Sequence, residues 1–267
     1  MNATHRLRGV SDLPSPLTTW SNALQQWAIP EHILSQAPQS PWIHPVENFR
    51  PHGNLFVDVP SRMRALEAIP NNGSVLDVGC GGGRATFGLI PPAGKVVGVD
   101  HQQGMLDVFG DEARKRGVEF QTVLGDWPES ADLTPVCDVA ICHHVFYNVQ
   151  NLEPFIRALD SHATKRVVVE LPLHHPLSSL SDLWLKFWDL KRPASPTAHD
   201  ALAVVQSLGF SASLELFEVA TEAKPISALD VEHTRIRLCL PESRDAEIAK
   251  ALAIRPTLPR QLATIWW

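Results

Sequence analysis

One short stretch, Ser74–Ile90, constrains the fold of this chain more than any other part of the sequence. It reads SVLDVGCGGGRATFGLI, with an apolar run typical of a buried strand, four glycines around Cys80, and a helix-compatible segment from Arg84 onward. Strand, glycine-rich turn and helix form the first unit of a nucleotide-binding α/β sheet. The glycines let a ligand approach the backbone, because no side chain intervenes.

The most informative residue of this stretch is Asp77, an acid inside the strand and two residues before the first glycine. A carboxylate at a buried strand end costs free energy unless it meets a polar or cationic group there. A cofactor with a positively charged amine would supply such a group. We therefore expect Asp77 to belong to a cofactor site.

Two other nucleotide-binding patterns do not fit the glycines. The nicotinamide fingerprint requires G-x-G-x-x-G/A. Counted from Gly79 its third position falls on Arg84, and counted from Gly81 it falls on Thr86. A phosphate-binding P-loop requires Gly-Lys-Ser or Gly-Lys-Thr, which does not occur in the sequence. The remaining alternative is a tight turn that binds no ligand.

The segment Asp77–Gly83 (DVGCGGG) resembles the first motif of the class I S-adenosylmethionine-dependent methyltransferases. Further segments of that family's pattern follow in order: KVVGVD at 95–100, EFQTVL at 119–124 with Gly125-Asp126-Trp127 after it, CDVAICH at 137–143 and KRVVVEL at 165–171. The resemblance covers roughly residues 70–220. It implies an α/β fold with a doubly wound, mostly parallel seven-stranded sheet, helices on both faces and an antiparallel last strand beside the fifth.

The resemblance also implies S-adenosylmethionine as cofactor, with S-adenosylhomocysteine as product. Asp100 would accept hydrogen bonds from the ribose hydroxyls and Asp126 one from the adenine amino group, with Trp127 as a wall for the base. The alternatives are a helix-capping role for Asp100, a turn or cap for Asp126 and a core position for Met105. The full expected cofactor set is Asp77, Gly79, Cys80, Gly81, Gly83, Asp100, His101, Met105, Gly125, Asp126, Trp127 and His143.

Two residues after the fourth strand segment, His144 and Tyr147, are the expected catalytic residues, because this position borders the methyl group in the family fold. A base is needed only when the acceptor must lose a proton, and histidine suits that task near neutral pH. We expect His144 to act as base and Tyr147 to orient the acceptor; the alternative is a structural role for each histidine. No metal is expected, because His174-His175 lie outside any H-E-x-x-H pattern.

Charge and aromatic content favour a small-molecule acceptor over a nucleic acid. The net charge of −6 lacks the clustered Lys and Arg that phosphates require. An aromatic acceptor-pocket lining would favour an apolar or planar acceptor, whereas the alternative is that these side chains only anchor helices. The aromatic residues concerned are Trp20, Trp27, Trp42, Phe49, Trp184 and Trp188. Two other functions stay open: a non-catalytic relative acting as a partner or regulator, and a protein or RNA methyltransferase.

The cysteines and the N-terminal sequence predict a cytoplasmic protein without membrane contact. Cysteines at 80, 137, 142 and 239 show no C-x-x-C spacing, as is typical of reduced thiols. The start of the sequence, MNATHRLRGV, lacks an apolar signal core, and no apolar run approaches the length of a membrane span.

We expect residues 1–70 to form an N-terminal helical extension or cap, and residues 71–267 a methyltransferase domain with helical insertions at about 176–208 and 227–253. One choice is difficult, because Thr234–Leu240 (TRIRLCL) alternates like a strand. Ser227 followed by Asp230 nevertheless has the spacing of a helix N-cap. We therefore predict helices there, and Gln261–Trp267 (QLATIWW) as the antiparallel strand.

Overall fold

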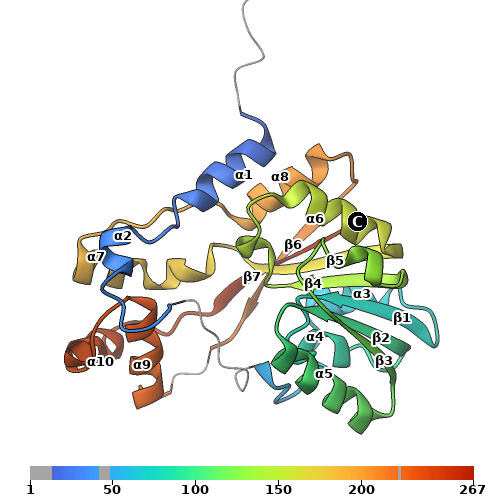
Figure 1. Ribbon diagram of the computed structural model, residues 1–267, viewed down its shortest axis with the longest axis horizontal. Helices are drawn as coiled ribbons and strands as arrows, with labels where there is room; N and C mark the ends of the chain where they lie inside the picture. Colours follow the sequence, from blue (N-terminus) through green and yellow to red (C-terminus); the bar gives the residue numbers. More distant parts are fainter. Residues whose placement is uncertain (1–13, 42–48, 222–223) are drawn as a thin grey trace, which may run out of the picture.

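A computed structural model describes residues 14–41, 49–221 and 224–267. A seven-stranded sheet forms its centre (Figure 1). Apolar runs broken by turns and helices produce this alternation of strand and helix. The strands are β1 (Gly73–Val78), β2 (Ala93–Asp100), β3 (Glu119–Leu124), β4 (Cys137–His143), β5 (Ala163–Pro172), β6 (Ser213–Val219) and β7 (Arg260–Trp266).

The strand order is β3-β2-β1-β4-β5-β7-β6, and this confirms the predicted doubly wound sheet. Strands β1 to β5 pair in parallel, whereas β7 pairs antiparallel with both β5 and β6. The order reverses between β1 and β4, where the chain crosses from one half of the sheet to the other. Ligands of such sheets bind beyond the carboxyl ends of the strands at this reversal.

Helices cover both faces of the sheet, because side chains of successive strand residues point to opposite faces. Val139 and Ile141 of β4 share one apolar cluster with side chains of α3, α4 and α5, whereas Ala140 and Cys142 share another with α1, α6 and α8. The helices of these two layers are α1 (Pro16–Gln25), α3 (Pro60–Leu66), α4 (Arg84–Phe87), α5 (Gln103–Arg116), α6 (Leu152–Ser161) and α8 (Ala198–Ser207).

A second helical group lies at one end of the molecule, on the left in Figure 1. Its core joins Ile33, Trp184, Val231 and Ile248, one from each of four helices. These helices are α2 (Glu31–Leu34), α7 (Ser181–Trp188), α9 (Ala228–Arg237) and α10 (Asp245–Ala253). Short 3-10 turns complete the elements: η2 (Ala131–Leu133), η3 (Phe146–Asn148), η4 (Pro176–Leu180) and η5 (Glu242–Arg244).

The prediction of a helix for the first alternating segment and a strand for the second is confirmed. Thr234–Arg237 belongs to α9, and β7 occupies the place predicted for Gln261–Trp267. The described helices are shorter than expected at several ends; α4, for example, ends at Phe87 and not at Ile90. Among the described residues, no helix is long and apolar enough to cross a membrane.

The proposed division at residue 70 stays a prediction, and the described part before it is packed against the rest of the chain. Trp20 of α1 is fully buried, and its indole donates a hydrogen bond to the carbonyl of Val149 at 2.9 Å. Arg192 is buried between Trp27 and Trp184 and donates to the carbonyl oxygens of Trp27 and Ala28, just after α1. A cation near the C-terminus of a helix is stabilised by the helix dipole.

Three of the aromatic residues considered as an acceptor lining are therefore core residues. Trp20, Trp27 and Trp184 are at most 3% exposed, so they anchor helices to the sheet and to one another. Trp188 is half-buried and donates to the carbonyl of Leu238 at 2.7 Å. Trp42 lies outside the described residues.

Candidate functional site

The glycine-rich turn lies at the carboxyl end of β1, as expected from its position after an apolar strand. Gly79, Gly81 and Gly83 have φ angles of 73°, 50° and 84°, in the left-handed region that side chains rarely adopt. The N–H groups of Gly79 and Cys80 donate to the carbonyl of Val99 at 2.9 and 3.0 Å. This pairing fixes the turn against β2.

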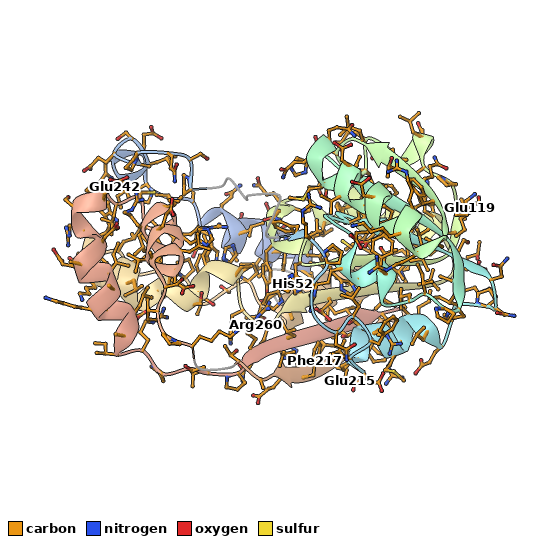
Figure 2. The ribbon with its side chains drawn as sticks, turned by 90° about the horizontal axis from the view of Figure 1, so that it is seen from below. His52, Glu119, Glu215, Phe217, Glu242 and Arg260 are labelled. Carbon is orange, nitrogen blue, oxygen red and sulfur yellow. The ribbon has the colours of Figure 1, made fainter. Side chains whose placement is uncertain are left out.

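Phe49 packs directly on the turn, which the sequence pattern did not predict. A Cβ at Gly82 would collide with the Phe49 carbonyl oxygen, and one at Gly81 would lie 3.2 Å from its ring. The carbonyl of nearby His52 accepts a hydrogen bond from the Arg84 guanidinium at 2.5 Å. Figure 2 shows His52 near the middle of the molecule, between the helical group that carries Glu242 and the sheet edge that carries Glu119. The turn is thus covered by a segment that precedes the sheet.

Asp100 ends β2 and holds the turn in place. Its two carboxylate oxygens accept from the N–H of Gly81 at 3.0 Å and of Gln102 at 2.9 Å. Its carbonyl accepts from the N–H of Gly125 at 3.1 Å, which ties the end of β3 to the same point. His101 is exposed, with its Nδ1 3.9 Å from an Asp100 oxygen. Asp100 therefore lies where the ends of β1, β2 and β3 meet.

Asp77 is buried below the turn and faces α4. Its carboxylate accepts a hydrogen bond from the Thr86 hydroxyl at 2.5 Å. The pKa of Asp77 is raised to about 7, mainly by burial and also by the nearby Asp100, against the opposing effect of the bonds from Thr86. The polar group that the sequence argument required is thus Thr86. Cys80 is also buried, and burial raises the pKa of its thiol well above the usual range.

The expected adenine-binding residues differ in accessibility. Asp126 is exposed after β3, whereas Met105 is only 2% exposed and packs in α5 against the core. The indole of Trp127 donates to the carbonyl of Phe155 at 3.2 Å, so that edge of the ring is directed at α6. Of these three residues, Asp126 is the polar group that solvent reaches.

His144 lies just past β4 and contacts Glu170, which in turn contacts Ser61, and sequence reasoning missed both of these residues. Its Nε2 is 3.3 Å from Glu170 Oε1, and Glu170 Oε2 accepts a hydrogen bond from the Ser61 hydroxyl at 2.5 Å. Burial favours the neutral form of Glu170, but the bond to His144, both nearby histidines and Ser61 lower its pKa to about 2. An ionised carboxylate thus lies behind an imidazole whose side chain is 41% exposed.

Two further residues near the end of β4, Tyr147 and His143, have buried polar atoms. Tyr147 is 4% exposed, and its hydroxyl donates to the carbonyl oxygens of Pro172 and Leu173 at 2.9 and 3.2 Å. Burial raises the pKa of Tyr147 above its ordinary value. His143 is half-buried, its Nε2 is buried and has no hydrogen-bond partner within residues 14–41, 49–221 and 224–267, and burial lowers its pKa. Tyr147 thus orients the end of β5 rather than presenting a free hydroxyl.

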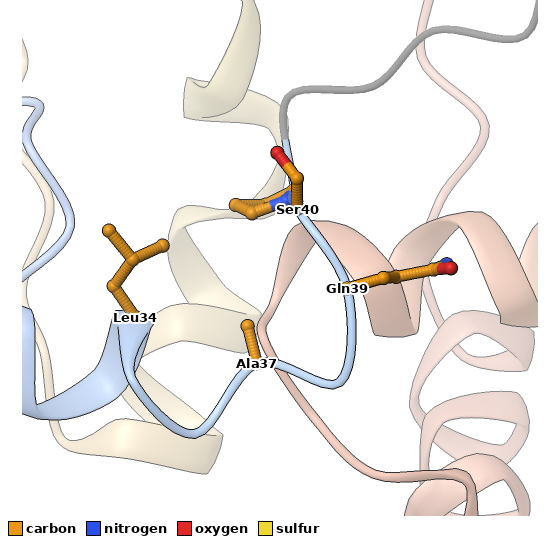
Figure 3. Close-up of a pocket in the computed structure, with 5 residues that line it drawn as sticks. Leu34, Ala37, Gln39 and Ser40 are labelled. Carbon is orange, nitrogen blue, oxygen red and sulfur yellow. The ribbon is translucent and has the colours of Figure 1, made fainter.

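A separate hollow of about 350 Å³ follows α2 (Figure 3). Its described lining residues belong neither to the turn nor to the His144 group, and none of them has a titratable side chain. Its lining residues are Leu34, Ala37, Gln39, Ser40 and Pro41. The chemistry of the molecule therefore lies at the strand ends and not at this hollow.

Residues 75–165 match the sequence profile of a methyltransferase domain family. Among characterised relatives, a ubiquinone biosynthesis O-methyltransferase of Rickettsia conorii is 33% identical over 88 residues, covering 33% of this chain and 30% of that protein. An uncharacterised Haemophilus influenzae protein is 32% identical over 95 residues, or 35% of each chain. This chain spans about a third of the length of these relatives.

Solved structures support the same fold at low sequence identity. A putative methyltransferase from Bacillus halodurans superposes with a TM-score of 0.53 at 17% identity, covering 78% of this chain and 96% of that one. Coclaurine N-methyltransferase gives a TM-score of 0.51 at 14% identity, covering 94% and 86%. Motif order, sheet topology and the profile match agree: residues 75–165 match a methyltransferase domain, and the sheet around them has the fold of class I methyltransferases.

Proposed function

We propose that this chain transfers a methyl group from S-adenosylmethionine to a small-molecule acceptor with a hydroxyl group. The observation that carries the proposal is the meeting of Asp100 with the glycine turn at the carboxyl ends of β1 and β2. Parallel sheets bind ligands at this edge, and it is the edge where the chain reverses its strand order.

The residues at this edge fit the cofactor. Each carboxylate oxygen of Asp100 accepts one backbone N–H, which leaves each oxygen a further lone pair for a ribose hydroxyl. The glycine turn offers backbone without side chains, and Asp126 offers an exposed carboxylate for the adenine amino group. A ligand ammonium group near the turn would favour the ionised form of Asp77, whose pKa of about 7 lets it respond to such a charge.

Three observations support a small hydroxyl-bearing acceptor: the net charge of the chain, the names of its relatives and the exposure of His144. The net charge of −6 disfavours nucleic acid. The relatives named for ubiquinone O-methylation act on a hydroxyl, although they match only a third of this chain. The side chain of His144 is 41% exposed, and the following residue, Val145, packs on Gly79 of the glycine turn. The bound cofactor supplies an activated methyl carbon, and His144 takes the proton that the acceptor oxygen loses.

Calorimetric titration tests the cofactor assignment. S-adenosylmethionine and S-adenosylhomocysteine should bind, whereas NAD should not. Asp100→Ala should weaken binding by about 1.5–3 kcal/mol, the scale of hydrogen bonds to a charged group. Because Asp100 also holds Gly81 and Gln102, the melting temperature of the unliganded variant must be measured beside its affinity.

Asp111→Ala is the matched control, because Asp111 is an exposed residue of α5 paired with Arg114. It should bind S-adenosylhomocysteine like the wild type. Wild-type affinity in Asp100→Ala would contradict the ribose assignment. If the protein binds S-adenosylmethionine but methylates no member of a broad set of metabolites, the non-catalytic alternative is favoured. Methyl transfer to a protein or an RNA would instead favour a protein or RNA methyltransferase.

A further inference from the structure

A buried carboxylate that the cofactor site does not use, Glu170, lies in β5 opposite His143 of β4. It is 7% exposed and contacts His144 with one oxygen and Ser61 of α3 with the other. We infer that Glu170, fixed by Ser61, is a positioning residue that keeps His144 protonated on Nε2, so that Nδ1 is the base for an acceptor hydroxyl. This inference rests on the proposed function and deepens it.

Two contacts fix His144 to the same residue. Its backbone N–H donates to the Glu170 carbonyl at 2.7 Å, while its ring Nε2 faces the Glu170 carboxylate at 3.3 Å. The φ angle of 63° places His144 in the left-handed region, which costs a non-glycine residue conformational energy. In this conformation the ring contacts Glu170 of β5. Such strain persists only where the surrounding contacts require it.

Ser61 determines which carboxylate oxygen is available to the histidine. Ser61 is 1% exposed, and its hydroxyl donates to Oε2, so Oε1 is left for His144. An ionised carboxylate accepts only, and the ring nitrogen facing it must therefore carry the proton. The other ring nitrogen, Nδ1, is then unprotonated in the neutral imidazole. A base oriented by a third group is the arrangement of nucleophilic and acid–base sites on many folds.

The residue that follows His144 contacts the glycine turn. A Cβ at Gly79 would collide with the side chain of Val145, the residue after His144, so this turn and the glycine turn are in direct contact. Both belong to the strand ends that flank the reversal of the sheet, β1 and β4. His144 therefore belongs to a segment that is in direct contact with the glycine turn.

Methyl transfer to a hydroxyl acceptor balances in both protons and charge. The acceptor oxygen forms a bond to the methyl carbon as the carbon–sulfur bond breaks, and its proton passes to His144 Nδ1. The positive charge of the sulfonium is lost and the imidazolium gains one, next to the Glu170 carboxylate. Glu170 stays ionised throughout, as its pKa of about 2 requires. A neutral amine acceptor attacks through its lone pair without this base, so the dyad favours alcohols and phenols.

Nitrogen NMR on histidine-labelled protein tests the dyad without any acceptor. His144→Gln assigns the His144 ring signals among the 12 histidines. At a pH where the ring is neutral, we expect Nε2 to carry the proton and its N–H resonance to lie downfield, as for a hydrogen bond to a carboxylate. Glu170→Gln should move that resonance upfield and speed its exchange with water, and Ser61→Ala should have a smaller effect in the same direction.

Glu218→Gln on edge strand β6 is the matched control, and it should leave the His144 ring signals unchanged. A wild-type ring protonated on Nδ1 would overturn the inference, as would ring signals that are the same in Glu170→Gln and the wild type. If Glu170→Gln does not fold, Ser61→Ala is compared with the wild type instead, and unchanged His144 ring signals would again overturn the inference. Failure to bind S-adenosylmethionine would instead remove the proposed function and leave the NMR result intact.

Measurements of kcat distinguish a positioning role of Glu170 from a purely structural one. With catechol and phenol as probe acceptors, Glu170→Gln should lower kcat on the order of 10²-fold, within the range for loss of acid–base assistance. The KM for S-adenosylmethionine should not change, and an amine probe such as benzylamine should be affected much less. An equal loss with hydroxyl and amine probes, or a loss confined to KM, would contradict the assignment.

Discussion

At the scale of single residues, the buried carboxylates of Asp77 in β1 and Glu170 in β5 have pKa values that shift in opposite directions. Burial raises the pKa of Asp77 to about 7. Glu170 is buried as well, but its contacts with His144, His143 and Ser61 lower its pKa to about 2. Asp77 has only the neutral Thr86 hydroxyl as its hydrogen-bonding side chain, whereas Glu170 has an imidazole. The identity of the partner decides which form of each acid the fold stabilises.

Asp77→Asn should stabilise the unliganded protein at alkaline pH. The folded pKa of about 7 lies above the ordinary 3.8, so the folded state binds more protons between these values. Stability from the protonated acid is therefore complete below pH 3.8 and lost as the pH rises through 7. Asn resembles the protonated acid and avoids this loss, which is on the order of 4 kcal/mol. Urea unfolding of the wild type and Asp77→Asn at pH 5 and pH 8.5 measures the difference in their free energies of unfolding.

The gain should be large at the higher pH and small at the lower one. Asp138→Asn is a useful comparison, because Asp138 accepts from Ser74 in the same sheet but is only half-buried. A gain for Asp77→Asn that does not change with pH would contradict the assignment of the shift to Asp77.

The sequence pattern located Asp77 within the first strand and Asp100 at the end of the second, as the structure has them, and their part in cofactor binding stays a prediction. It did not predict Ser61 or Glu170. In the sequence, Glu170 is a single polar residue in an apolar strand, and Ser61 is a polar residue in a helix. Their meeting depends on the pairing of β4 with β5 and on how α3 packs, and neither is local in the chain. Phe49 was missed as a turn contact for the same reason.

At the scale of elements, α9 shows how a local signal can outweigh a strand-like pattern. Thr234–Leu240 alternates, yet the chain enters it through a capping box in which Ser227 and Asp230 bond each other's backbone N–H groups. These bonds are 3.1 Å to Ser227 Oγ and 2.8 Å to Asp230 Oδ2. A cap acts over one turn and is readable from sequence, so this element could be predicted correctly. The exact helix ends depend on tertiary packing and could not.

Ser227→Ala should therefore destabilise the helical group. Loss of an N-cap hydroxyl costs about 1 kcal/mol, and Ser227→Asp should restore most of it because Asp also accepts from the helix N–H groups. Ser243→Ala, at an exposed serine of η5, is the control. The midpoint of guanidinium unfolding gives the comparison, and a Ser227→Ala midpoint equal to that of Ser243→Ala would contradict the role of the cap.

At the scale of the whole molecule, β7 joins the two parts of the sheet. It lies between β5 and β6 and pairs antiparallel with both, although β6 precedes it in the chain by the length of two helices. Leu262, Ala263 and Ile265 are at most 5% exposed. Removing this strand would leave backbone groups of β5 and β6 unpaired, and exposed strand edges promote aggregation.

Deletion of residues 261–267 should therefore abolish cooperative folding, and Ile265→Ala provides a graded version. A fully buried isoleucine truncated to alanine costs about 2–5 kcal/mol through lost contacts and the cavity left behind. Gln261→Ala, at an exposed position of the same strand, should cost far less. Thermal unfolding followed by circular dichroism distinguishes them. A deletion that unfolds with the wild-type midpoint would show that the sheet does not depend on β7.

The sequence has a single tyrosine, and its location gives the protein an intrinsic probe. The Tyr147 ring stacks on Trp20 with centroids 5.5 Å apart and meets the edge of His175 at 5.3 Å. Three segments distant in the chain therefore meet at one aromatic ring. Fluorotyrosine incorporated biosynthetically would give one fluorine resonance, assigned without mutagenesis. Its shift and linewidth would report directly whether helix α1 and the ends of β4 and β5 move when a cofactor is added.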